Sequence, residues 1–178
     1  MTNVVDDDSA LPRSAATSSR VAADPSDLRH RIEAVDRAWI AADGAPGEVQ
    51  LAEARDAVAE LVAALEAGTV RAAVPDPDAY AGWHVESWVK RGILMGFRLP
   101  GMTEYRDGPV ISARDKAAYG LLDLIDSEAA RSADEAGAPW RVVPGGSTVR
   151  SGTHLDPGVT IMPPSYANIG AWVGRGTM

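Results

Sequence analysis

Histidine and carboxylate side chains are the first candidates for catalysis or metal binding, because a histidine beside an acid can act as a base or bind a metal. The sequence has three histidines, His30, His84 and His154, and no cysteine. They lack the mutual spacing and the acidic company of a metal site or a catalytic triad. The pair Gly145-Gly146 lacks the lysine and the strand–loop–helix context of a phosphate-binding loop. We therefore expect surface or structural histidines and no metal.

Basic and aromatic residues are the next candidates for ligand contacts. Lys90, Arg91 and Arg98 lie together on one side of a predicted helix, where a solvated face is the more ordinary explanation. Four of the tryptophans are interpreted as packing residues rather than stacking platforms: Trp83, Trp88, Trp140 and Trp172.

Composition narrows the class of protein. The chain of 178 residues is 46% hydrophobic and 24% charged, and its formal net charge of -8 argues against general nucleic-acid binding. No apolar run approaches the ~20 residues that cross a bilayer. The N-terminus lacks the basic and apolar regions of a secretory signal. We expect a cytoplasmic protein with neither nucleic acid nor a membrane as its partner.

Two amphipathic helices are predicted after a disordered leader, residues 1–23, which is rich in Ser, Ala and Asp. The first begins at Asp24-Pro25 and ends at Gly44, and the second spans Glu48 to Ala67. Their inward positions follow helical spacing: Leu28, Ile32, Val35 and Trp39 in the first, and Leu51, Val58, Leu61, Val62 and Leu65 in the second.

A short strand is expected at residues 69–74, before a turn rich in proline and aspartate. A helix is predicted from Trp83 to Leu99, and another from Ser112 through Leu121, Leu122 and Leu124 to about Gly137. Residues 24–139 are therefore interpreted as a helix-rich α/β N-terminal domain.

A six-residue repeat replaces this pattern from Val149 onward. The first position of five consecutive hexads is aliphatic or alanine: Val149, Leu155, Ile161, Ala167 and Val173. In a parallel β-helix of triangular section each face takes about six residues, and three hexads complete one coil. Residues 140–178 are therefore predicted to start a left-handed parallel β-helix with these side chains pointing inward. Five hexads make less than two coils, so we expect a truncated solenoid and a longer parent protein.

Two stretches of the sequence resemble a known enzyme family. One runs from Glu86 to Leu99, and the other begins Trp140-Arg-Val-Val-Pro-Gly-Gly and continues through Ile161-Met-Pro-Pro-Ser-Tyr to Gly176-Thr-Met. They resemble tetrahydrodipicolinate N-succinyltransferase. The resemblance implies transfer of a succinyl group from succinyl-CoA, a co-substrate, to the amino group of a tetrahydrodipicolinate-derived dicarboxylate, in the diaminopimelate route to lysine. It also implies a homotrimer, no catalytic metal and no permanently bound cofactor.

The resemblance assigns one site residue. In the family, the arginine before Val-Val-Pro contacts the substrate carboxylate, and here that residue is Arg141. No catalytic residue is assigned, because the family's acid follows Thr-Met-Val and would lie beyond Met178. The sequence contexts of Asp126 and Asp156 do not match it. The residues that bind CoA are not assigned.

Two other classes of function stay open at this point. The chain could belong to a related hexapeptide acyltransferase with another acceptor, although no sugar-nucleotide motif is present. It could also be a non-catalytic, truncated interaction module, in which the open end of the prism adds strands to a partner.

Overall fold

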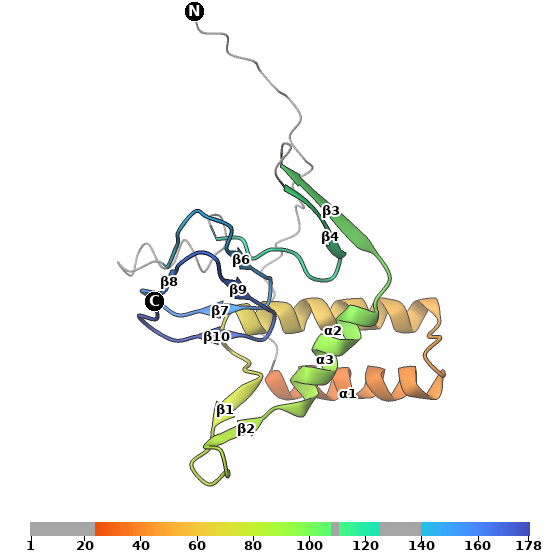
Figure 1. Cartoon of the computed structure of the whole chain (residues 1–178). Helices are drawn as coiled ribbons and strands as arrows, with labels where there is room; N and C mark the ends of the chain where they lie inside the picture. Colours follow the sequence, from red (N-terminus) through yellow and green to blue (C-terminus); the bar gives the residue numbers. More distant parts are fainter. Residues whose placement is uncertain (1–23, 108–110, 125–139) are drawn as a thin grey trace, which may run out of the picture.

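The computed structural model describes residues 24–107, 111–124 and 140–178. The expected leader and the part of the last predicted helix after residue 124 lie outside the described residues. Figure 1 shows the helices beside antiparallel hairpins and a set of short strands near the C-terminus. The helices are α1 (Pro25–Ala41), α2 (Glu48–Glu66) and α3 (Ser87–Arg98), and the hairpin strands are β1 (Ala73–Pro75), β2 (Trp83–Val85), β3 (Met102–Asp107) and β4 (Ile111–Lys116).

The first two helices confirm the predictions made from their periodicity. Asp24 caps α1 by accepting a hydrogen bond from the Ser26 backbone N–H at 2.9 Å, and Pro25 stands in the first turn. The four predicted inward residues of α1 are all buried. In α2, Val58, Leu61 and Leu65 are buried with two alanines, while Leu51 and Val62 pack partly against the same core.

Helix α3 packs against both earlier helices through glycines as well as apolar side chains. Trp88, Val89 and Met95 are buried in the shared core. A Cβ at Gly92 would meet Leu61 and Ile32, and one at Gly96 would overlap the ring and hydroxyl of Tyr119. These two glycines therefore let α3 approach its neighbours closely.

Helix α3 begins later than predicted. Trp83–Val85 forms strand β2, which pairs antiparallel with β1, and the expected strand at residues 69–74 is shifted to Ala73–Pro75. The helical spacing of Val85 is misleading because its side chain is 60% exposed and contributes nothing to the helix's buried face.

The helix predicted to start at Ser112 is wrong. Residues Ile111–Lys116 form β4, which pairs antiparallel with β3 in a register that places Tyr105 opposite Ala113. The leucines that suggested a helix serve a different core: Leu122 and Leu124 pack against the C-terminal strands. The Leu122 backbone N–H also donates to the Val149 carbonyl at 3.0 Å.

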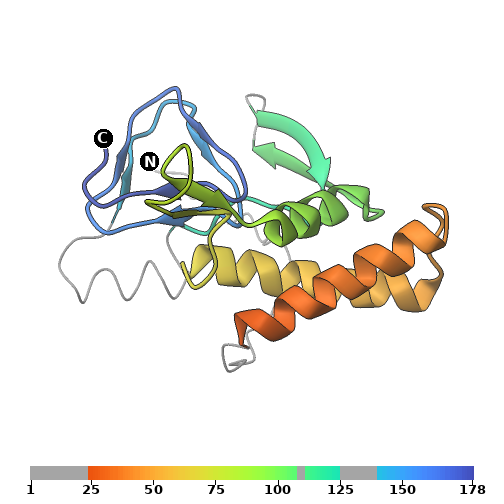
Figure 2. The same cartoon turned by 90° about the horizontal axis from the view of Figure 1, so that it is seen from below.

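Six two-residue strands follow and pair in parallel. They are β5 (Arg141–Val142), β6 (Thr148–Val149), β7 (His154–Leu155), β8 (Thr160–Ile161), β9 (Tyr166–Ala167) and β10 (Trp172–Val173). β5 pairs with β8, β6 with β9 and β7 with β10. Val149 lies opposite Ala167 and Leu155 opposite Val173, so the chain returns to the same position after 18 residues. In Figure 2 the backbone of this segment follows a roughly triangular path.

The repeated aliphatic positions share one core, as predicted. Val149, Leu155 and Ile161 are buried together with Val159, and Ala167 and Val173 are partly buried against them. This second core is distinct from the one formed by the helices.

Arg150 joins the two cores. Its side chain is only 8% exposed and forms an ion pair with Asp115 of β4. It also donates to the Asn168 side-chain oxygen at 3.3 Å. The guanidinium carbon lies 5.2 Å from the centre of the Phe97 ring and 5.6 Å from that of Tyr119. The arginine therefore contacts β4, α3 and the end of β9 at once.

Replacing Gly96 by alanine is expected to destabilise the fold by about 1–3 kcal/mol through overpacking. Tyr119 cannot move aside easily, since it is 1% exposed and its hydroxyl donates to the Ile93 carbonyl at 2.7 Å. The free energy of unfolding in urea measures the effect. Gly174→Ala is the control, because a Cβ there meets only Thr177, at 4.0 Å. Equal losses for the two variants would contradict the proposed packing.

Candidate functional site

Arg141 begins β5 and presents an exposed side chain. Its backbone N–H donates to the Val159 carbonyl at 2.8 Å, which holds the strand in register beside β8. Within the described part of the chain, no carboxylate forms an ion pair or hydrogen bond with its guanidinium. The fork of N–H donors is therefore open to a ligand.

The histidines occupy two kinds of environment. His30 and His84 are exposed, as expected, and His84 Nε2 lies 3.9 Å from Glu86 Oε1. His154 differs, because its Nε2 lies 3.2 Å from Asp156 Oδ1. Among the described residues His154 thus has one acidic neighbour, which is not a metal site or a triad, and its two contacts fit the expected structural role. Residues two apart in an extended segment point to the same side, so the spacing of His154 in β7 and Asp156 just after it was the available signal.

Both ring nitrogens of His154 face hydrogen-bond acceptors. Nδ1 lies 2.7 Å from the Glu66 carbonyl oxygen, and Nε2 faces the Asp156 carboxylate. His154 therefore bridges the Asp156 carboxylate and the carbonyl of Glu66, the last residue of α2.

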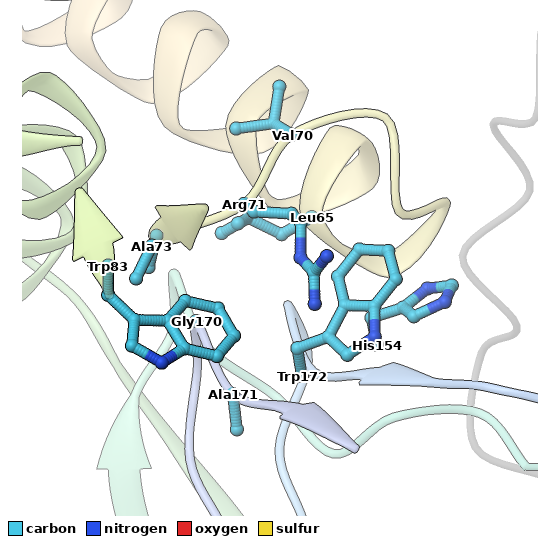
Figure 3. Close-up of a pocket in the computed structure, with 10 residues that line it drawn as sticks. Leu65, Val70, Arg71, Ala73, Trp83, His154, Gly170, Ala171 and Trp172 are labelled. Atoms are coloured by element: carbon cyan, nitrogen blue, oxygen red, sulfur yellow. The ribbon is translucent and has the colours of Figure 1, made fainter. Parts of the chain in front are cut away.

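The indole of Trp172 forms a hydrogen bond at one edge and has a side chain packed against each face. Its indole Nε1 donates to Asp156 Oδ2 at 3.0 Å. The guanidinium carbon of Arg71 lies 3.7 Å from the centre of the indole ring, and the His154 ring centroid lies 3.9 Å from it. In Figure 3, Arg71 and His154 lie on either side of the indole. Trp172 therefore packs against two side chains of its own chain, Arg71 and His154.

The other tryptophans divide between packing and exposure. Trp88 is buried in the helical core, and Trp140 packs partly against the core of the strands, so both are packing residues as expected. Trp83 is 50% exposed, and packing does not account for it.

A cavity of about 230 Å³ separates Trp83 from the stacked group, as Figure 3 shows. It lies between the chain that follows α2 and the β7–β10 pair. Its walls are mostly apolar, and its charged or titratable members are Arg71 and His154. The lining residues are Leu65, Val70, Arg71, Ala72, Ala73, Trp83, His154, Gly170, Ala171 and Trp172.

Glu66 anchors the end of α2 to the strand segment. Its Oε1 accepts a hydrogen bond from the Gly152 backbone N–H at 2.8 Å. Burial raises the pKa of the Glu66 carboxyl above its usual value of 4.5, and the charge of Asp123 acts in the same direction, while the bond from Gly152 opposes them.

The basic residues of α3 make ordinary surface contacts. Arg91 lies 3.5 Å from Glu33 and Arg98 lies 3.6 Å from Asp36, both on α1. The two arginine side chains are about half exposed, so each pair adds little stability. Lys90 is exposed. The described residues include no group of three or more histidines and acids placed to hold a metal ion, and none of their helices could span a membrane.

Residues 30–99 match the family described as tetrahydrodipicolinate N-succinyltransferase N-terminal. This part of the chain is thus similar to the N-terminal domain of that family. The resemblance to this enzyme family is confirmed, and its stretch from Glu86 to Leu99 lies within the matched residues.

The curated relatives extend the similarity across most of the chain. A 2,3,4,5-tetrahydropyridine-2,6-dicarboxylate N-succinyltransferase from Paramagnetospirillum magneticum is 37% identical over 144 residues, which cover 81% of this chain and 48% of the relative. Enzymes of the same name from a Methylobacterium species and from Cereibacter sphaeroides are 36% and 33% identical, covering 85% and 82% of this chain and 50% and 49% of their own lengths. The chain thus spans about half the length of the curated relatives it matches.

Replacing Asp156 by asparagine is expected to destabilise the fold by about 1 kcal/mol at neutral pH, through loss of the charged acceptor for His154 and Trp172. Burial by itself would raise the pKa of Asp156. The hydrogen bonds from His154 and Trp172 and the charges of His154 and Arg175 outweigh it and hold the pKa below 3.8. The stability that the carboxylate contributes is therefore present above pH 3.8 and is lost as the pH falls through the lowered pKa.

Urea unfolding at several pH values from 7 down to 2, well below the usual pKa of 3.8, measures this difference. The exposed Asp78→Asn serves as the control and should change little at any pH. A loss in Asp156→Asn that stays constant down to the lowest pH would contradict the assignment.

Replacing Glu66 by glutamine is expected to leave the fold at least as stable as the wild type at pH 7. The amide oxygen can still accept the Gly152 N–H, while the cost of burying a charge disappears. Since the folded-state pKa of Glu66 is raised, the wild type loses stability as the pH rises through that pKa, and any advantage of the variant should vanish below pH 4.5. Thermal unfolding at pH 4 and 7 tests this, and a large loss at pH 7 would show that the charge itself is needed.

Proposed function

We propose that this chain functions in an N-succinyltransferase that transfers the succinyl group from succinyl-CoA to the amino group of a tetrahydrodipicolinate-derived dicarboxylate. The observation that carries the proposal is sequence identity of 33–38% to enzymes that bear this name, over 70–85% of the chain. The route served is diaminopimelate and lysine biosynthesis, and a biosynthetic role of this kind fits the cytoplasm.

The proposed architecture has two parts. Residues 24–139 form the N-terminal domain, and residues 140–178 form the first coils of a left-handed parallel β-helix. The 18-residue return between Val149 and Ala167 supports this assignment, as does the shared core of the repeated aliphatic positions. The assembly proposed is a homotrimer of such prisms.

The chemistry is aminolysis of a thioester. The substrate amine attacks the succinyl carbonyl carbon, a C–N bond forms, the C–S bond breaks, and CoA leaves as the thiol once the amine has given up a proton. A general base assists that proton loss. The family's acid has no counterpart in the sequence at hand, so none of the described carboxylates is given this role.

Arg141 is proposed to bind a carboxylate of the acceptor. Its guanidinium is exposed and has no carboxylate partner in the described part of the chain, and a planar fork of donors matches the two oxygens of a carboxylate. The remaining carboxylate and the CoA arm would be held by other groups.

Kinetics of the enzyme that contains residues 1–178 test this role. Arg141→Ala is expected to lower kcat/KM for the dicarboxylate by about tenfold to a hundredfold, because a charge-assisted pair is lost, and to leave KM for succinyl-CoA nearly unchanged. Release of the CoA thiol is the measured signal. Arg141→Lys should recover part of the loss, since it keeps the charge without the fork.

The matched control is Arg37→Ala, an exposed arginine on α1 that should leave both constants as they are. Equal increases in both Michaelis constants for Arg141→Ala would contradict the proposed role. Thiol release with other amines but not with the cyclic dicarboxylate would instead indicate a related acyltransferase with another acceptor. No thiol release with any amine would favour an interaction module.

A further inference from the structure

Arg71 is a half-buried cation without an acceptor. Its Nε is inaccessible to solvent and has no hydrogen-bond partner in the described part of the chain. No carboxylate lies within ion-pair distance of its guanidinium there. Arg150, the other arginine of residues 24–107, 111–124 and 140–178 that is not exposed, has both an ion pair and hydrogen bonds. A buried donor without a partner is costly, so the environment of Arg71 favours an added acceptor.

The guanidinium is already oriented for such a group. Trp172 covers one face of it at 3.7 Å, and the indole is itself fixed by its bond to Asp156 and its contact with His154. Stacking of this kind leaves the donors at the edge of the guanidinium plane free to form hydrogen bonds. A ligand would therefore meet donors whose position is set in advance.

The cavity beside Arg71 limits the chemistry of that ligand. Its volume of about 230 Å³ admits a small molecule only. Leu65, Val70 and Trp83 give it apolar walls, and none of its lining residues is acidic. An apolar wall opposite one fixed arginine suits an organic acid with a single carboxylate. It suits a phosphate less well, because two negative charges would meet only one unpaired guanidinium.

We propose that this cavity binds a small organic carboxylate, with its two oxygens on the Arg71 guanidinium and its apolar body against Trp83. The site is independent of the proposed acceptor site, because it adjoins β7–β10 whereas Arg141 lies on β5 of the β5–β8 pair. Arg71 follows α2, and Trp172 lies in β10, so a bound acid also links the helical part to the strand segment.

Benzoate is the probe that tests the site, with benzamide and benzylamine as ligands of similar shape but neutral and cationic. Titration is followed by the fluorescence of the tryptophans, since Trp83 and Trp172 line the cavity, and by the shift in melting temperature. Benzoate is expected to bind saturably and about tenfold or more tightly than benzamide. Benzylamine should not bind.

Variants then assign the binding to these residues. Arg71→Gln should weaken benzoate binding by about tenfold or more, and Trp83→Ala should weaken it less while removing part of the fluorescence change. Trp83 is half exposed, so this second variant keeps the test open if Arg71→Gln fails to fold. The matched control is Arg37→Gln, which should bind as the wild type does.

Three results would overturn the proposal. They are equal binding of benzoate and benzamide, unchanged binding in a folded Arg71→Gln, and no saturable signal up to about 10 mM benzoate. Arg141→Ala separates the two sites: benzoate binding should persist in it, and loss there would place the probe at the proposed acceptor site instead.

Discussion

The burial of the Arg150 charge is the constraint on which the arrangement of the molecule depends. A guanidinium that is 8% exposed must keep its partners, because an unpaired buried charge costs several kcal/mol. Those partners come from separate elements: Asp115 from β4, Asn168 from the chain after β9, and the Phe97 ring from α3. A shift of the helices relative to the strand segment would therefore expose this charge or separate it from its partners.

A second joint at the end of α2 completes the arrangement. The last residue of that helix supplies both a carboxylate for the Gly152 N–H and a carbonyl for His154. Gly68 follows at a φ of +72°, and a Cβ there would approach the His154 ring to 2.6 Å, so the chain turns away where only glycine fits. The cavity beside Arg71 exists because these two joints hold the chain after α2 a fixed distance from β10.

Sequence periodicity predicted the elements that bury their own repeating side chains and failed for those that are set by pairing. The faces of α1 and α2 were predictable because each helix buries its own periodic side chains, and the inward row from Val149 was predictable because the same position recurs. The hairpins were not, since β2 has exposed side chains and β4 is set by pairing with β3. The leucines after residue 120 kept a helical spacing although they pack elsewhere.

The candidate site shows the same division. Arg141 was recognisable from its neighbours in sequence, because the motif around it is contiguous. The stack of Arg71, Trp172 and His154 was not recognisable, because Arg71 comes from the chain after α2 and the other two from paired strands. Only the two-residue spacing of His154 and Asp156 gave a local signal, and it is weak because β7 has two residues and ends before Asp156.

The 18-residue return explains how one short segment can serve several tasks without conflict. Positions six residues apart lie on successive sides of the triangular path. The β5–β8 side carries Arg141, the chain just after β6 and β9 carries Arg150 and its partner Asn168, and β7–β10 faces α2. The inward row is shared, but the outward residues of each side meet different neighbours. Outward-facing residues can therefore be substituted at the proposed acceptor site, at the joint between the cores or at the Arg71 cavity. The common core of Val149, Leu155 and Ile161 is unaffected by such substitutions.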